Sequence, residues 1–408
     1  MSKNSQKMYI VMTGLPARGK STIAARIRES FLASDIPTEI FNNGDLRRQM
    51  IDRDTAGADF YDPKNRQGTA LREHIAVTNI ENARRFIDNG GQVAILDATN
   101  VSQKRRDLII SMLTDSPILF LETVNTDPEI LEANIHRKAK LPEFAHFGHQ
   151  EAVKSFKERI QYYQRISSPF RDEANYIQVD SLHNKILRFW LTDHLPHFEQ
   201  LRDLLVTDYV KNLFLVRHGQ STDNIVERIG GDAPLTDKGK QQAMNLGDAF
   251  CSTPLPYVFC SHKTRTRQTA KPICDNQTCG CTLIPLKEFN EIDAGVCEEM
   301  TYEEIKAKMP HVYYERLMDK YNYVYPQGEG YVSMRTRIDR GVKKALFLSG
   351  NADNIVIVGH RAVNRMILAH FLYRRIEDVP YIYVPQNQYY HIISMQQKKL
   401  FELKKISN

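Results

Sequence analysis

The residues best suited to chemistry in the first half of this chain are GLPARGKS, at positions 14–21. They match G-x-x-x-x-G-K-[ST], the pattern of a loop whose backbone N–H groups surround phosphate oxygens. An apolar run at 8–12 predicts a buried strand before the loop, and apolar residues spaced four apart over 22–31 predict a helix after it. A simple glycine-rich turn is the alternative, but the full set of fixed positions favours the phosphate loop. The candidate nucleotide-binding residues are Gly14, Arg18, Gly19, Lys20, Ser21 and Thr22.

Three residues of this half have specific expected roles. Lys20 is expected to reach the β- and γ-phosphates of ATP as a point charge, and the Ser21 hydroxyl to bind Mg²⁺. Asp97 closes an apolar strand predicted at 92–97, where phosphate-loop enzymes carry a second Mg²⁺ ligand. An aspartate after a strand can also cap the next helix; the phosphate loop favours the metal role.

The second half carries residues suited to phosphohistidine chemistry. Arg217 and His218 end an apolar strand predicted at 211–216, and His360 ends another at 355–359. Neutral imidazole is a nucleophile, and arginine neutralises an incoming phosphoryl group. A single histidine of this kind can be structural. Two strand-end histidines, together with Arg265 and an acidic loop that contains Glu291, instead indicate a phosphate pocket with an acid.

Length and composition limit the remaining options. A chain of 408 residues predicts two or three domains. The polar N-terminus lacks an apolar signal region, and no apolar run approaches the roughly 20 residues of a membrane span, so we expect a cytoplasmic protein without membrane contact. The net charge of +6 is modest and no basic-aromatic motif occurs, so we expect no nucleic acid partner.

The six cysteines all lie in the second half. Cys274, Cys279 and Cys281 cluster, but the chain has no C-x-x-C pair followed by a histidine pair at zinc spacing. The spacing therefore favours structural or free thiols over a metal site.

Apolar strands alternate with helical patterns in the first half, which predicts a parallel sheet with helices on both faces. We expect a helix over 70–89, a loop or lid over 52–67, and helical structure from 183 to about 205. A new strand starts at 211, so a short connection is expected near 206–211 between two abutting domains.

The two halves together resemble the bifunctional 6-phosphofructo-2-kinase/fructose-2,6-bisphosphatase family. The resemblance extends from Tyr9 to about Tyr383 and rests on GLPARGK at 14–20, DATN at 97–100 and NEIDAGVCEEMTYEEI at 290–305. It implies an α/β P-loop kinase domain over 1–208, with a mostly parallel sheet flanked by helices. It also implies a histidine phosphatase, phosphoglycerate mutase-like α/β domain over 209–408. The implied reactions make fructose 2,6-bisphosphate from ATP and fructose 6-phosphate, and hydrolyse it again.

The resemblance also assigns roles to individual residues. The implied fructose 6-phosphate ligands of the kinase are Arg47, Arg72, Thr99, Arg105, Arg159 and Tyr163. Asn134 matches the nucleotide-side asparagine, and Lys140 matches the catalytic lysine if one residue is inserted. In the phosphatase, His218 matches the nucleophile and Glu291 the proton donor. The residues implied to bind the bisphosphate are Arg217, Asn224, Gly230, Arg265, Tyr302, Arg316, Lys320, Tyr331, His360 and Arg365.

Three positions depart from the family pattern. Asn125 replaces a cysteine of the kinase, Gln220 replaces the glutamate after R-H-G, and Arg361 replaces the glutamine after the second histidine. We count Arg361 among the substrate-binding residues because it adds a cation beside His360. The long tails of animal members are missing, so we expect no control by tail phosphorylation.

Two other functions are weighed against the bifunctional enzyme. Only one activity could be retained, with the other domain as a binding module, because departures occur near both sites. A nucleic-acid end-healing kinase fused to a phosphatase requires a basic groove with stacking aromatics, and no such stretch occurs. The sequence leaves both a monomer and a homodimer open.

Overall fold

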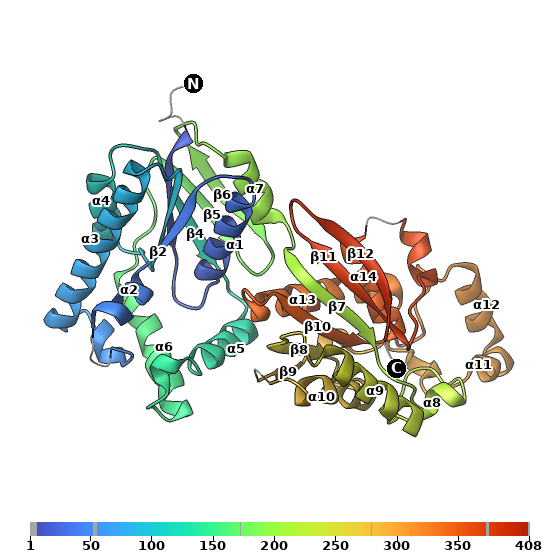
Figure 1. Cartoon of the computed structure of the whole chain (residues 1–408). Coiled ribbons are helices and arrows are strands. Elements are labelled where there is room, and N and C mark those ends of the chain that lie inside the picture. Colours follow the sequence, from blue (N-terminus) through green and yellow to red (C-terminus); the bar gives the residue numbers. More distant parts are fainter. Residues whose placement is uncertain (1–5, 52–54, 172, 279, 373–374, 407–408) are drawn as a thin grey trace. The chain divides into compact units, whose positions relative to one another are not determined.

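A computed structural model of the chain (Figure 1) describes residues 6–51, 55–171, 173–278, 280–372 and 375–406. The chain divides into two compact units, Met1–Thr207 and Asp208–Asn408, and each is described by itself. Among the described residues, no helix is long and apolar enough to cross a membrane.

The described residues of unit 1 form a six-stranded sheet in the order β2-β3-β1-β4-β5-β6. All neighbouring strands are parallel except β5 and β6. The strands are β1 (Met8–Thr13), β2 (Thr38–Asn42), β3 (Val93–Asp97), β4 (Ile118–Val124), β5 (Asn175–Asp180) and β6 (Lys185–Leu191). The α-helices are α1 (Lys20–Leu32), α2 (Asn43–Met50), α3 (Arg66–Asp88), α4 (Gln103–Met112), α5 (Pro128–Lys138), α6 (His149–Ile166) and α7 (Phe198–Val206). Among the described residues, 3₁₀ turns also form at η2 (Ala58–Tyr61) and η3 (Pro142–Phe144). The mostly parallel sheet confirms the predicted fold of this half.

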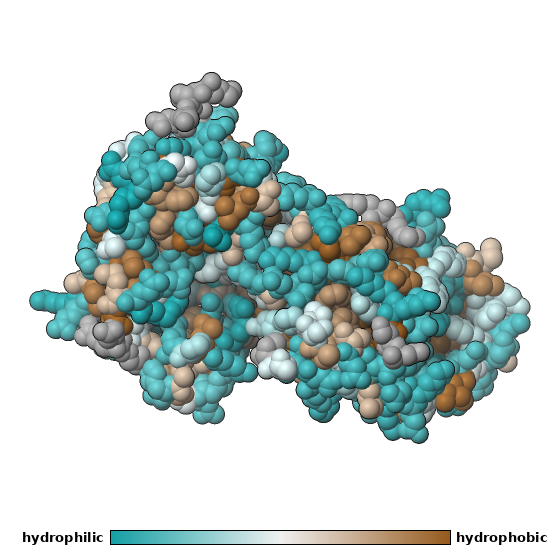
Figure 2. Space-filling model, viewed as in Figure 1, coloured by the Kyte–Doolittle hydropathy of each residue, from teal (hydrophilic) through white to brown (hydrophobic). Residues whose placement is uncertain are grey.

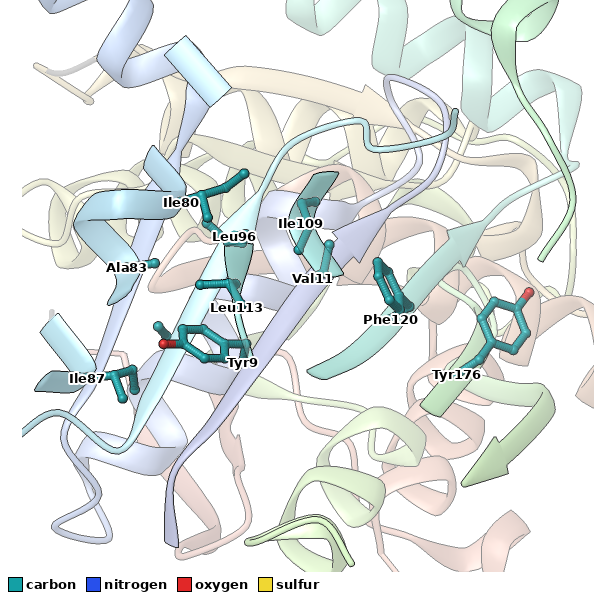
Figure 3. Packing of buried hydrophobic residues seen from close by; sticks show 11 residues of the cluster. Tyr9, Val11, Ile80, Ala83, Ile87, Leu96, Ile109, Leu113, Phe120 and Tyr176 are labelled. Carbon is teal, nitrogen blue, oxygen red and sulfur yellow. The ribbon is translucent and has the colours of Figure 1, made fainter. Parts of the chain in front are cut away.

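One hydrophobic cluster of unit 1 lies between the sheet and two of its helices (Figure 3). Tyr9 and Val11 of β1, Leu96 of β3 and Phe120 of β4 point to one face, which α3 and α4 cover. Every residue of β1 is buried, as expected for a central parallel strand packed on both faces. This packing fixes the carboxyl ends of β1 and β3, from which the phosphate loop and Asp97 emerge.

Two element predictions for unit 1 need correction. The prediction of continuous helix from 183 to 205 is wrong, because β6 occupies its first part and only α7 is helical. Asp180 accepts backbone N–H groups from Leu182 and His183, which turns the chain back so that β6 pairs with β5 as an antiparallel edge strand. In the predicted loop at 52–67, η2 forms and α3 already begins at Arg66; positions 52–54 lie outside the described residues.

Unit 2 has a second six-stranded sheet among its described residues, in the order β12-β11-β7-β10-β8-β9. The strands are β7 (Val210–Arg217), β8 (Tyr257–Cys260), β9 (Thr282–Pro285), β10 (Asn354–Gly359), β11 (Gln388–Ser394) and β12 (Lys399–Lys405). The α-helices are α8 (Thr222–Ile225), α9 (Asp237–Phe250), α10 (Thr264–Asp275), α11 (Tyr302–Lys308), α12 (Pro310–Met318), α13 (Tyr331–Ser349) and α14 (Arg361–Phe371). Three 3₁₀ turns are present as well, η4 (Lys287–Phe289), η5 (Gly295–Cys297) and η6 (Ile376–Tyr381). β7 through β10 are parallel, whereas β11 and β12 are antiparallel.

The surface and the cysteines add two observations. The visible faces of both units carry mainly hydrophilic residues with separate hydrophobic patches (Figure 2). Cys274 and Cys281 form a disulfide, so the prediction of thiols is wrong for this pair. Cys279 lies outside the described residues.

Candidate active sites

The phosphate loop of unit 1 runs from the end of β1 to the start of α1, where the sequence predicts it. Its backbone requires glycine at Gly14 and Gly19, which have φ values of +129° and +85°. A Cβ atom at Gly14 would lie 2.4 Å from the carbonyl oxygen of Thr123 in β4. The loop is therefore held tightly against the neighbouring strand, with the N-terminus of α1 behind it.

Lys20 lies folded back into this loop. Its Nζ donates to the carbonyl oxygens of Gly14 and Leu15, at 2.7 and 2.8 Å. Burial lowers the pKa of Lys20 to about 7, and the charge of Asp97 opposes that shift. A phosphate chain in the loop would supply the anion that a buried ammonium group needs.

The predicted Mg²⁺ ligands suit a hard cation. Asp97 is buried at the end of β3 and accepts from Asn42 Nδ2 at 2.5 Å, while Ser21 lies exposed in the first turn of α1. Carboxylate and hydroxyl oxygens are the donors that Mg²⁺ prefers. The alternative role of Asp97 as a helix cap is not observed, because Ser102 caps α4. The donor set fits the ion.

α5 contributes the next residues. Asn134 donates to the carbonyl oxygen of Ala17 in the phosphate loop at 2.8 Å. Lys138 follows four residues later on the same helix face, where burial lowers its pKa and the nearby charge of Asp97 raises it. Lys140 lies beyond the end of α5 and is exposed, and within the described chain its side chain makes no hydrogen bond or ion pair with the loop. Lys138, four residues after Asn134, is therefore a second lysine candidate beside Lys140.

The predicted fructose 6-phosphate ligands converge around one aromatic residue, Tyr61 of η2. The guanidinium carbon of Arg159 lies 3.9 Å from the centre of the Tyr61 ring, and those of Arg47 and Arg72 lie at 5.7 and 5.9 Å. The ring of Tyr163 is 6.1 Å away. The structure thus brings these four predicted ligands together.

Several cations of this cluster are paired with carboxylates. Arg47 and Arg48 both bind Glu143, and Arg105 binds Glu73 at 3.0 Å. The cluster therefore contains anions that a sugar phosphate must compete with. The remaining predicted ligand, Thr99, accepts the Gly14 N–H through its carbonyl at 3.1 Å, which ties the 97–100 motif to the phosphate loop.

Asn125 is buried at the end of β4, and its Oδ1 accepts the Asp127 N–H at 2.9 Å. Asp127 in turn caps α5. The Asn125 side chain therefore stabilises the turn that leads into α5. This contact uses the amide oxygen and needs no thiol at position 125.

In unit 2, strand register brings the two histidines together. β7 pairs in parallel with β10, and Arg217 lies opposite Gly359, so the residues that follow, His218 and His360, leave adjacent strands at the same edge. Their ring centres are 5.2 Å apart. His218 Nδ1 donates to the Gly219 carbonyl at 2.7 Å, which leaves Nε2 with the lone pair.

Both histidines are buried in a cationic environment. Burial and the charges of Arg265 and Arg217 hold the pKa of His218 well below its usual value. His360 is fully buried, shares a hydrogen bond with Ser261 at 2.8 Å, and also has a strongly lowered pKa because of burial. His218 is therefore neutral near pH 7, as a nucleophile must be.

A cavity of about 530 Å³ opens beside His218. Every predicted phosphatase residue lines it except His360, which is fully buried. These lining residues are Arg217, His218, Asn224, Gly230, Arg265, Glu291, Tyr302, Arg316, Lys320, Tyr331, Arg361 and Arg365. Gln220 lines it as well.

The cations of this cavity are held by neutral groups. Arg217 donates to the carbonyl oxygen of Val384 at 3.2 Å, and Arg265 to that of Gly231 at 3.0 Å. Arg316 donates to the Tyr302 hydroxyl at 2.9 Å, and Arg365 to the Tyr331 hydroxyl at 3.1 Å. Burial and the charges of the neighbouring arginines together lower the pKa of Lys320 to about 8.

Arg361 is exposed at the first position of α14, yet it belongs to this site. Its charge lowers the pKa values of Arg217, His218 and Lys320. It lines the cavity, within electrostatic reach of these three groups.

Sequence reasoning missed three residues that support the cavity. Gln386 Nε2 donates to the carbonyl of His218 at 3.2 Å and to Asn224 at 2.9 Å. Arg337 donates to the carbonyl oxygens of Glu288 and Asn290, both at 2.7 Å, and so braces the loop of Glu291.

Glu298 is the third of these residues. It accepts from the backbone N–H groups of Gly231 and Ala294, and so joins two loops of the cavity wall. The acidic run at 298–299 could have identified Glu298 from the sequence, whereas no local sequence pattern identifies Gln386 or Arg337.

Comparison with known proteins matches both units. Residues 1–198 match the 6-phosphofructo-2-kinase family, and residues 213–408 match the histidine phosphatase superfamily, branch 1. The chain is 32% identical to a 6-phosphofructo-2-kinase/fructose-2,6-bisphosphatase of Aquarana catesbeiana, covering 94% of this chain and 81% of that protein. Isoform 1 from Rattus norvegicus is 31% identical, and isoform 1 from Homo sapiens 32%; each comparison covers 94% of this chain and 80% of the relative. With a kinase and a phosphatase domain in one polypeptide, the chain belongs to the bifunctional 6-phosphofructo-2-kinase/fructose-2,6-bisphosphatase family.

Proposed function

We propose that unit 1 transfers the γ-phosphoryl group of ATP to the 2-hydroxyl of fructose 6-phosphate, and that unit 2 hydrolyses the resulting 2-phosphate. The observation that carries this proposal is the parallel register that sets His218 beside His360 at the edge of a cationic cavity. Family membership supports the substrate assignment.

In the kinase, the phosphate loop holds the triphosphate, and Lys20 neutralises charge on the transferring group. Mg²⁺ held by Ser21 and Asp97 would neutralise further charge on the β- and γ-phosphates. We assign Lys138, rather than Lys140, to the role of the second catalytic lysine, because Lys138 shares a helix face with Asn134 and lies near Asp97. The arginine cluster around Tyr61 holds the sugar phosphate, and catalysis is mainly alignment.

In the phosphatase, His218 Nε2 attacks the phosphorus of the 2-phosphate, and the bond to the sugar oxygen breaks. Glu291 donates its proton to that leaving oxygen. Water then attacks the phosphohistidine as Glu291 takes a proton back, which releases phosphate and neutral His218. Arg217 and Arg265 stabilise the phosphoryl oxygens throughout.

The test uses fructose 2,6-bisphosphate labelled at the 2-phosphate. The label should remain on the protein as an acid-labile, alkali-stable adduct, and His218→Ala should not trap it. Hydrolysis by His218→Ala at a near-normal rate would exclude the covalent route. A parallel assay with ATP and fructose 6-phosphate tests the kinase; absence of either wild-type activity would leave that unit as a binding module.

A further inference from the structure

Tyr61 of η2 carries a buried hydroxyl group without a partner. The residue is 5% exposed, and its Oη has no hydrogen-bond partner among the described residues. Buried polar groups are normally hydrogen-bonded, because an unpaired one loses its hydrogen bonds to water and gains none from the protein. A phenylalanine would fill the same space without this penalty, so packing alone does not account for the hydroxyl group.

The surroundings of Tyr61 indicate what the hydroxyl group binds. Arg159 lies over its ring at 3.9 Å, and Arg47 and Arg72 lie within 6 Å of the ring centre. The Nε atoms of Arg47 and Arg159 are also buried without a hydrogen-bond partner in the described chain. Arginines from several elements are therefore gathered around the Tyr61 ring, and such a group of donors suits an anion with several oxygens.

The position of η2 is fixed by its contacts with α3. Arg72 donates to the carbonyl oxygen of Phe60, and Asn65 caps α3 immediately after η2. A Cβ atom at Gly68 would lie 2.6 Å from the Phe60 carbonyl oxygen, so only glycine allows this approach. The Tyr61 ring is thus held among the arginines by the fold and is not carried on a free loop.

We propose that Tyr61 is a substrate-binding residue of the kinase, whose hydroxyl donates to a phosphate oxygen of fructose 6-phosphate. Its ring also keeps the guanidinium group of Arg159 in place by a cation–π contact. The proposal rests on the proposed kinase function of unit 1 and adds a ligand that the sequence patterns did not indicate.

The test compares Tyr61→Phe with the wild-type full-length chain. Loss of one hydrogen bond to a charged group should raise KM for fructose 6-phosphate about tenfold. The kcat value and the KM for ATP should change by less than about twofold, because the ring and the phosphate loop remain. The matched control is Tyr162→Phe, which removes a hydroxyl from a half-buried tyrosine of α6 that has no role in the proposed site. This control should behave like wild type.

Two further measurements separate the possible outcomes. Without ligand, Tyr61→Phe should unfold at the same or a higher temperature, because it removes an unpaired buried group; a clear decrease would indicate a structural role and overturn the proposal. Thermal stabilisation by fructose 6-phosphate alone measures binding without catalysis. If the wild type is stabilised but makes no bisphosphate, the proposed function fails while Tyr61 can still be judged. If Tyr61→Phe equals wild type in both KM and binding, Tyr61 is not a ligand.

Discussion

The two catalytic sites both gather cations for phosphate, but they hold those cations in different ways. In the kinase, Arg47 and Arg105 are paired with carboxylates, those of Glu143 and Glu73. In the phosphatase, Arg217 and Arg265 donate to backbone carbonyl oxygens. In the described part of the chain, no carboxylate lies within salt-bridge distance of the arginines that line the phosphatase cavity, which are Arg217, Arg228, Arg265, Arg316, Arg361 and Arg365.

The two kinds of partner have different effects on an arginine: both orient its guanidinium group, but only a carboxylate neutralises its charge. A carbonyl oxygen orients a guanidinium group and leaves its full charge available, whereas a carboxylate also neutralises it and competes with the ligand. The phosphatase cavity should therefore retain anions tightly. Because carboxylates compete for its arginines, the kinase cluster should bind fructose 6-phosphate less tightly than the phosphatase cavity binds its substrate. The same competition should help the kinase to release its product, which carries one more phosphate.

The largest expected effect tests whether the two sites act independently. Lys20→Ala should lower kinase turnover about 10²-fold or more, because it removes a charge opposite the transferring phosphoryl group, and it should leave bisphosphate hydrolysis intact. His218→Ala should do the reverse. Both rates are measured on each purified variant. Equal loss of both activities in a folded variant would contradict two separate sites.

Arg361→Gln tests the excess charge of the phosphatase. Arg361 should bind phosphate oxygens in the ground state as well as in the transition state. The variant should therefore show a KM for fructose 2,6-bisphosphate and an inhibition constant for phosphate that are each raised about tenfold, with kcat equal or higher. Arg335→Gln, which removes an exposed cation from α13, is the charge-matched control. Unchanged KM and inhibition would show that Arg361 is not a ligand.

Glu143→Gln tests the competing carboxylate of the kinase. The amide keeps an acceptor for Arg47 but removes the negative charge, so KM for fructose 6-phosphate should fall about threefold to tenfold. Slower release of the bisphosphate should accompany the lower KM, and rapid-mixing kinetics can measure it. A rise in KM would mean that Glu143 acts mainly to orient Arg47.

The smallest expected effect is the uptake of a proton by Lys20 when ATP binds. A lysine with a lowered pKa loses its proton as the pH rises through that value, so free Lys20 is mostly neutral at pH 8 and mostly charged at pH 6. ATP should raise its pKa again. Calorimetry in two buffers of different ionisation enthalpy should show proton uptake with ATP at pH 8 and little at pH 6. Lys20→Arg, always charged, should show none; an equal uptake in that variant would assign the proton to another group.

The sequence by itself determined the parts of this protein that depend on local pattern. The phosphate loop, the strand ending in Asp97 and the strands ending in His218 and His360 follow from short apolar runs and the residues beside them. Parallel strands bring their carboxyl ends to one edge, so these side chains could be predicted to meet. The mostly parallel sheet of unit 1 followed from the alternation of strands and helices.

The tertiary structure decided the rest. The sequence offers both Lys138 and Lys140, and the contact of Asn134 on α5 with the phosphate loop is the structural reason for proposing Lys138, which shares a helix face with Asn134. The strand β6 has an apolar pattern compatible with a helix, and its pairing with β5 fixes it as an edge strand. Tyr61, Arg337 and Gln386 act on residues distant in the sequence, through backbone carbonyls and ring faces that no local pattern encodes. Those contacts exist only because the folded chain brings separate elements within hydrogen-bond or van der Waals distance.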